Sequence, residues 1–445
     1  MNDLTARVPL RFPTAAATFA IGIAGYLGVN LSPYMITALQ TGFAVDVLTA
    51  SWIVTATLLA TAITGLATAP LCAGAHRRTV ARIGLAAGLV GFVAAALVPS
   101  AGVAIAGLLV GGVGAGCAVA AAGAALAAFR NPDRVAGFNG LANRGVITIV
   151  LAVIPLIGLA PIDVFGALAL FCLVGLLAVG WLPMAPVIDP QAGAAVPEAM
   201  PITIPETGVV QSVRARTASR TVTIAGFALL VTFALWAASE DSLWAMAGVM
   251  GGEQAGLTPE GLGLALSGAT AGGLVGSVLL MIVGNRLGRA VPLVVLLVAG
   301  GGLKIALGFA GDQTAFITLF IVWNTIYAIA FMYFVSTSAA LDADGRWSGP
   351  LLAVYLVGSA LTPVIGAALV EAFGYQGFTV VLGVASFVLA IPAAIVAAIS
   401  TRVEKVPTPS PNAAGASFGA SGRVGPAAAD ATALTPAAET EELHA

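Results

Sequence analysis

Four ionisable side chains lie inside long apolar runs of this 445-residue chain, and they are the residues best placed to do chemistry. They are Arg144, Glu240, Asp241 and Lys304. A charge at the centre of a membrane-spanning helix costs about 2.5–3.5 kcal/mol, so each of them needs a structural or functional reason.

The surroundings of Glu240 suggest proton exchange. Thr232, Trp236, Glu240 and Trp244 recur every four residues and share one face of a helix. Asp241 lies about 100° around that helix, among alanines that are typical of helix contacts. We therefore expect Glu240 to face a central cavity, with Asp241 as a weaker candidate for proton coupling. The alternative is that water solvates both acids at the outer end of the helix.

Arg144 and Lys304 lie in two other runs. Arg144 lies about two turns inside its run, where it could bind a carboxylate of a solute or pair with an acid across a cavity. It could also extend its long side chain to the membrane surface. We expect Lys304 to do the latter, toward the opposite side of the membrane.

Polar and aromatic side chains form two further stripes. Tyr26, Asn30 and Tyr34 recur every four residues in the first apolar run, and a later run carries Trp323, Asn324 and Tyr327. With Trp236 they could bind a polar organic solute by hydrogen bonds and stacking. The alternative is that they join neighbouring helices.

The composition indicates helices in a membrane. The mean hydropathy is +1.02 and only 9% of residues are charged, which excludes a soluble globular protein. About 20 apolar residues cross a bilayer as a helix. Twelve runs of that kind are found, near 14–38, 51–72, 83–99, 102–128, 137–159, 163–183, 222–246, 259–283, 290–310, 313–338, 349–371 and 377–400.

The basic residues predict the orientation of these helices. Sixteen of the eighteen Lys and Arg residues lie in alternate gaps between the runs, and the other gaps contain none. Basic gaps stay in the cytoplasm, so both termini are expected there. We expect a multi-pass protein of a bacterial cytoplasmic (inner) membrane, in contact with lipid.

The runs divide into two related halves. Pro155 and Pro363 lie about 210 positions apart, as do two basic loops, which indicates a duplicated unit of six helices. Secondary transporters are often built in this way, with the solute between the repeats. The predicted organisation is a cytoplasmic N-terminus at 1–13, helix bundles at 14–183 and 222–400, a cytoplasmic linker at 184–221 and a disordered cytoplasmic tail at 401–445.

Loop and helix motifs resemble those of the Major Facilitator Superfamily. The segment GNRLGR at 284–289 resembles the loop motif of that family, with Asn285 in place of the acid, and GAHRRTVAR from Gly74 is its degenerate counterpart. Glycines at 112, 114 and 116 resemble a further motif, but Leu108 stands where drug exporters carry an Arg. The resemblance implies an all-α fold of twelve transmembrane helices in two pseudo-symmetric bundles. It also implies a cytoplasmic gate made by Arg77, Arg78, Asn285, Arg286 and Arg289.

The sequence therefore favours secondary transport by alternating access. No ATP-binding loop is present, and neither the three cysteines nor the two histidines form a metal or haem site, so we expect no cofactor, no metal and no enzymatic activity. The net charge of −2 offers no polybasic surface for nucleic acid. We predict a monomer that takes up a small organic anion or zwitterion with protons, with efflux of drugs or metabolites as the alternative. A membrane sensor that has lost transport is a third possibility.

Overall fold

A computed structural model describes residues 7–130, 132–184, 209–283, 288–341 and 347–404, and these residues are almost entirely helical. The predicted tail after Glu404 and the linker residues 185–208 lie outside this part of the chain. The second part of the predicted linker is helical, since α8 begins at Val209.

The first half of the chain, residues 7–184, provides the first six predicted crossings. Its helices are α1 Phe12–Asn30, α2 Ser32–Phe43, α3 Val47–Ala73, α4 Arg77–Leu97, α5 Ala101–Leu126, α6 Pro132–Ile157 and α7 Pro161–Ala178, followed by the 3₁₀ turn η1 Val179–Trp181. The first crossing is divided at Leu31 into α1 and α2. Pro33 lies in the first turn of α2, where a missing backbone N–H is tolerated.

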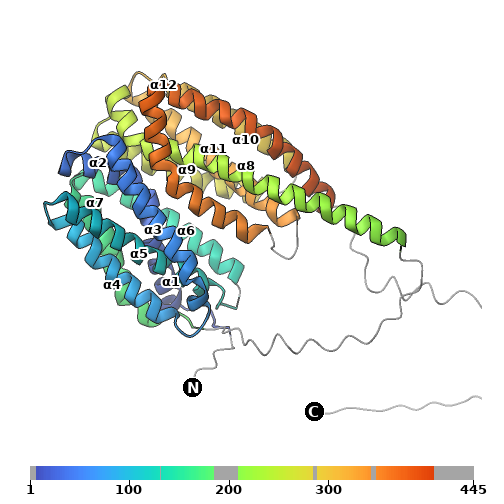
Figure 1. Cartoon of the computed structure of the whole chain (residues 1–445), viewed down its shortest axis with the longest axis horizontal. Coiled ribbons are helices and arrows are strands. Elements are labelled where there is room, and N and C mark those ends of the chain that lie inside the picture. The colour runs from blue at the N-terminus through green and yellow to red at the C-terminus, as the bar shows by residue number, and fades with distance from the viewer. Residues whose placement is uncertain (1–6, 131, 185–208, 284–287, 342–346, 405–445) are drawn as a thin grey trace, which may run out of the picture. The chain divides into compact units, whose positions relative to one another are not determined.

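The second half, residues 209–404, provides the other six crossings. Its helices are α8 Val209–Ala255, α9 Pro259–Val283, α10 Ala290–Leu307, α11 Gln313–Leu341 and α12 Ser348–Glu404. The last of these contains two predicted crossings that meet at Gly374, whose φ of +66° lies in the left-handed region that glycine favours. The described residues thus form an all-α membrane protein whose helices provide the twelve predicted crossings, six in each half of the chain. Figure 1 shows how these helices pack against one another.

The surface of the helices is apolar. Ile83, Val90, Ile149 and Leu177 are examples of large side chains that are more than half exposed. Ten helices in the described ranges are long and apolar enough to cross a bilayer. Exposed apolar surface on this scale indicates contact with lipid.

Glycines bring three helices of the first half into close contact. A Cβ atom on Gly91 or Gly114 would collide with backbone atoms across the α4–α5 interface, and one on Gly112 or Gly116 would collide with the backbone of α3. Such contacts let helices approach closely in a bilayer.

Hydrogen bonds join the two halves. Thr148 on α6 donates to Thr270 on α9 over 2.8 Å, and the indole of Trp244 on α8 donates to the carbonyl of Asn30 over 3.2 Å. The backbone N–H of Val364 on α12 donates to Thr55 on α3 over 3.2 Å. Trp244–Asn30 and Val364–Thr55 lie toward the helix ends that the charge pattern assigns to the outside of the cell, whereas Thr148–Thr270 lies near the middle of its two helices.

Candidate solute-binding site

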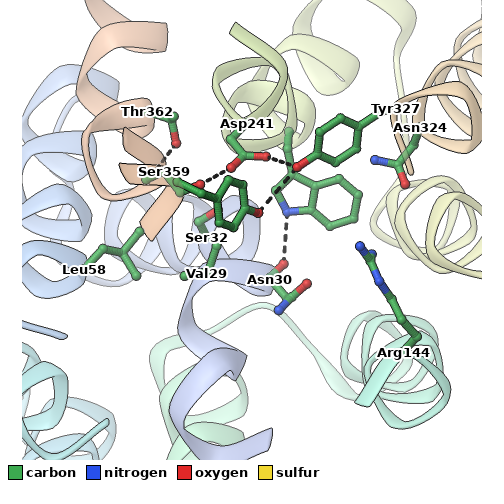
Figure 2. Close-up of a pocket in the computed structure, with 12 residues that line it drawn as sticks. Val29, Asn30, Ser32, Leu58, Arg144, Asp241, Asn324, Tyr327, Ser359 and Thr362 are labelled. Atoms are coloured by element: carbon green, nitrogen blue, oxygen red, sulfur yellow. Dashed lines mark hydrogen bonds between the residues drawn. The ribbon is translucent and has the colours of Figure 1, made fainter. Parts of the chain in front are cut away.

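A small polar pocket lies between the two halves, with a volume of about 40 Å³. Five residues of α1, α2, α3 and α6 and seven of α8, α11 and α12 line it. They are Val29, Asn30, Ser32, Leu58, Arg144, Asp241, Trp244, Asn324, Tyr327, Tyr355, Ser359 and Thr362 (Figure 2). One water molecule needs roughly 10–15 Å³ by this measure, so this conformation has room for about three.

Asp241 is the acid of the pocket. The Tyr327 hydroxyl donates to Oδ1 over 3.0 Å, and the Ser359 hydroxyl donates to Oδ2. The hydroxyl of Tyr355 lies 3.4 Å from that of Tyr327 and extends the cluster. Among the described residues, the carboxylate is therefore held by neutral hydroxyl groups and forms no salt bridge with a cation.

Arg144 is the cation of the pocket. Its side chain points from α6 into the space below Asn324 (Figure 2). Within the ranges that the structure describes, no carboxylate forms a salt bridge with its guanidinium. A guanidinium offers five N–H donors in a planar fork that matches a carboxylate. The pocket thus presents one positive and one negative side chain that do not pair with each other.

Glu240 lies outside this pocket, which differs from the expectation for this residue. Its Oε1 lies 2.7 Å from the ammonium of Lys304, and its Oε2 accepts a 2.6 Å hydrogen bond from the indole of Trp323. Lys304 is fully buried and also donates to the hydroxyls of Ser239 and Ser386, at 2.9 and 2.7 Å. Lys304 therefore does not extend to the membrane surface, because an ion pair inside the second half satisfies it.

Aromatic side chains connect this ion pair with the pocket. The ring of Trp323 is stacked on that of Tyr327, with centroids 6.2 Å apart and an interplanar angle of 13°. Trp323 donates to Glu240 and Tyr327 donates to Asp241, so the two stacked rings lie between the two acids. Trp236 packs against Tyr327 at 5.3 Å and is buried beside the pocket rather than in it.

The three residues of the polar stripe on the first crossing lie in three different environments. Asn30 lines the pocket, and Tyr26 lines an adjoining, mainly apolar cavity of about 430 Å³ between α1, α3, α5 and α12, which shares Val29 and Leu58 with the pocket. Tyr34 is buried and donates a 2.6 Å hydrogen bond to the carbonyl of Leu151. Tyr34 therefore joins α2 to α6, as the alternative interpretation of the stripe predicts.

Part of the pocket comes from residues that the sequence analysis did not select. Tyr355, Ser359 and Thr362 lie on α12 at spacings of four and three, which place them on one face of that helix. This spacing is the signal that could have identified them. It is weak, because Ser and Thr inside helices more often bond to their own backbone.

The described gate residues lie at the starts of two helices, since Arg77 and Arg78 are the first residues of α4 and Arg289 directly precedes α10. Arg77 donates to the carbonyls of Cys72 and Pro183, and Arg78 donates to that of Leu182, so both hold the end of η1 against the α3–α4 turn. Arg289 donates to the hydroxyl of Ser336 over 3.0 Å. Asn285 and Arg286 lie outside the described residues.

Solved structures of transporters share this fold. A peptide transporter (POT) in complex with sulfate has a TM-score of 0.67 and 14% identity, over 90% of this chain and 97% of that chain. A POT family transporter in complex with 5-aminolevulinic acid has a TM-score of 0.63 and 14% identity, over 88% and 96%. A D-xylose–proton symporter has a TM-score of 0.62 and 15% identity, over 85% and 95%.

The sequence comparisons assign the family. No curated protein matches the chain in sequence. The family model of the Major Facilitator Superfamily matches residues 15–349, about three quarters of the chain. The chain belongs to the Major Facilitator Superfamily.

Proposed function

We propose that this secondary transporter takes up a small organic monoanion together with a proton. The anion binds Arg144 and the proton binds Asp241. The observation that supports this most directly is the presence of these two opposite charges in one pocket without a bond between them.

Charge balance links the two ligands. A net charge in a confined, poorly hydrated site is costly. The empty pocket is neutral, since Arg144 and Asp241 cancel each other. An anion alone would leave a negative pocket, whereas an anion with a proton on Asp241 keeps it neutral. The two ligands therefore favour each other's binding and move in the same direction.

This proposal gives Asp241, rather than Glu240, the role of proton site. Glu240 already has Lys304 as its counter-ion and Trp323 as a donor, so a proton there would break a satisfied pair. Protonation of Asp241 breaks no ion pair. The related structures agree with this class of function, because one is named as a proton symporter and others hold sulfate or 5-aminolevulinic acid.

The cavity beside Tyr26 supports efflux as a second candidate function. It is about ten times larger than the polar pocket and is lined by Leu58, Leu66 and Val119 among others. An apolar drug would fit this cavity better than an anion would. Resistance to lipophilic drugs on overexpression, without proton-driven anion uptake, would favour efflux.

Proteoliposomes test proton-coupled uptake. We expect radiolabelled small monocarboxylates to accumulate when the outside is at pH 6 and the inside at pH 8, and not when the gradient is absent. Asp241→Asn mimics the protonated acid, so it should abolish gradient-driven accumulation but keep exchange of internal and external solute. Arg144→Gln should lower both, while Arg402→Gln, at an exposed position near the end of α12, serves as the matched control. Gradient-driven accumulation by the Asp241→Asn variant would overturn the proposal.

A further inference from the structure

Asn324 brings an unsatisfied acceptor to the solute pocket. Its side chain is 2% exposed, and its Oδ1 atom has no hydrogen-bond partner. Asn324 lies on α11 directly after Trp323 and about one helical turn before Tyr327. Its amide points toward the guanidinium of Arg144 (Figure 2). Buried amide oxygens are normally paired, so an unpaired one in a binding pocket indicates a missing donor.

No side chain of the pocket donates to that oxygen in this conformation. The hydroxyls of Tyr327 and Ser359 donate to Asp241, and the indole of Trp244 donates to the carbonyl of Asn30. The N–H groups of Arg144 are the cationic fork that a carboxylate would occupy. A simple carboxylate brings only acceptors, so it would bind Arg144 and leave the Asn324 oxygen unpaired.

We propose that the transported solute is a small 2-hydroxy monocarboxylate. This inference rests on the proposed function, and it adds the chemistry of the solute beside its carboxylate. The carboxylate binds Arg144, and the neighbouring hydroxyl donates to Oδ1 of Asn324. Both groups lie on adjacent carbons of the solute, and Arg144 and Asn324 line the same pocket, with the Arg144 side chain pointing toward Asn324 (Figure 2).

Charge and size select a hydroxyl over other donors. An ammonium group would also donate to Asn324, but a 2-amino acid is a zwitterion and adds no net charge for the proton on Asp241 to balance. The pocket volume of about 40 Å³ disfavours solutes as large as a dipeptide in this conformation. A hydroxyl on a short monoanion satisfies charge, hydrogen bonding and size together.

The uptake of three related solutes by the full-length wild-type protein tests the inference. Proton-driven uptake into proteoliposomes is measured for 2-hydroxypropanoate, propanoate and 2-aminopropanoate. A site built to pair with a hydroxyl discriminates against the analogue that lacks it, so we expect kcat/KM to be about 10- to 100-fold higher for 2-hydroxypropanoate than for propanoate.

Two variants assign the preference to Asn324. Asn324→Leu has nearly the same size but no acceptor, so it should lower the kcat/KM ratio of 2-hydroxypropanoate to propanoate from about 10–100 to about one. Thr325→Val is the control, because the hydroxyl of Thr325 bonds to the backbone of its own helix outside the pocket.

Each other outcome overturns the inference in a distinct way. Equal uptake of 2-hydroxypropanoate and propanoate, both driven by protons and dependent on Asp241, would overturn the hydroxyl specificity and leave the proposed function intact. A preference for 2-aminopropanoate would replace the hydroxy acid by a zwitterion. Failure of every monocarboxylate to follow the proton gradient would overturn both proposals. If the Asn324→Leu variant does not fold, the ratio of kcat/KM for 2-hydroxypropanoate and propanoate in the wild type decides whether the inference holds.

Discussion

Two carboxylates that are neighbours in the chain have opposite environments. Glu240 faces an ammonium and an indole N–H, whereas Asp241 faces only hydroxyl groups. The three N–H donors of Lys304 meet three acceptors, on Glu240, Ser239 and Ser386, so this pair is fully satisfied. A satisfied pair stabilises one arrangement, while the carboxylate without a cation can exchange its proton.

Removing one partner of the Lys304–Glu240 pair should destabilise the protein strongly. Lys304→Met or Glu240→Gln leaves the other partner unpaired in a buried site, which costs about 3–5 kcal/mol. The double variant has no unpaired charge, so it should recover at least half of that loss. Thermal unfolding of the wild type, the two single variants and the double variant in the same detergent gives the coupling energy between Lys304 and Glu240. If the losses of the two single variants simply add in the double variant, the pair makes no energetic contribution as a pair.

The amino-acid sequence identified the charged residues that matter but not their partners. The cost of an intramembrane charge marked Arg144, Asp241, Glu240 and Lys304 as special. Periodicity along α8 could not decide between its two acids, because the answer depends on Lys304, 64 positions away on α10. Asn324 was selected for its polar stripe, yet only the structure shows that its oxygen lacks a partner.

At the level of helices, glycine positions determine how closely α4 and α5 pack. A Cβ atom on Gly114 would meet the carbonyl of Gly84 and the backbone of Gly88, and backbone atoms cannot move aside easily. Gly123 lies further along α5 with nothing within 4 Å of the same added atom. At Gly114 the close packing of α4 and α5 therefore requires the absence of a side chain, whereas at Gly123 of the same helix it does not.

The Gly114→Ala variant should be clearly less stable than Gly123→Ala. Extra methyl groups in a tightly packed interface cost about 1–3 kcal/mol. Gly123→Ala should be neutral or slightly stabilising, because alanine is the better helix former. Thermal midpoints in the same detergent compare the two variants with the wild type. Equal midpoints for both variants would show that the α4–α5 contact tolerates a wider separation.

Helix positions were predictable because length and polarity decide them, whereas helix breaks were not. Each of the twelve predicted runs corresponds to a helical segment. The break between α1 and α2 at Leu31 depends on one or two backbone angles that the composition does not show. The same holds for Gly374, where two crossings follow each other without a loop. The early start of α8 at Val209 also escaped prediction, because residues 211–221 are mostly polar.

At the level of the whole molecule, three hydrogen bonds of the described residues join the halves, each at or within about one helical turn of residues that line the solute pocket. Thr148–Thr270 joins α6 to α9, Trp244–Asn30 joins α8 to α1, and Val364–Thr55 joins α12 to α3. Alternating access requires one side of the site to close while the other opens. The duplicated landmarks in the sequence predict two halves, but they contain no information on which side chains meet between them.

A disulfide across Thr148 and Thr270 should arrest transport. The two hydroxyl oxygens lie 2.8 Å apart, a separation compatible with the Cβ···Cβ distance of about 3.5–4.5 Å in a disulfide. The native cysteines Cys72, Cys117 and Cys172 are buried and unpaired, so they should not compete for the new thiols. In the Thr148→Cys/Thr270→Cys variant, mild oxidation should abolish uptake and a reductant should restore it. Each single variant, oxidised in the same way, should keep its uptake. Because the bond would hold α6 against α9, full transport by the crosslinked protein would show that the halves do not separate at this contact during the cycle.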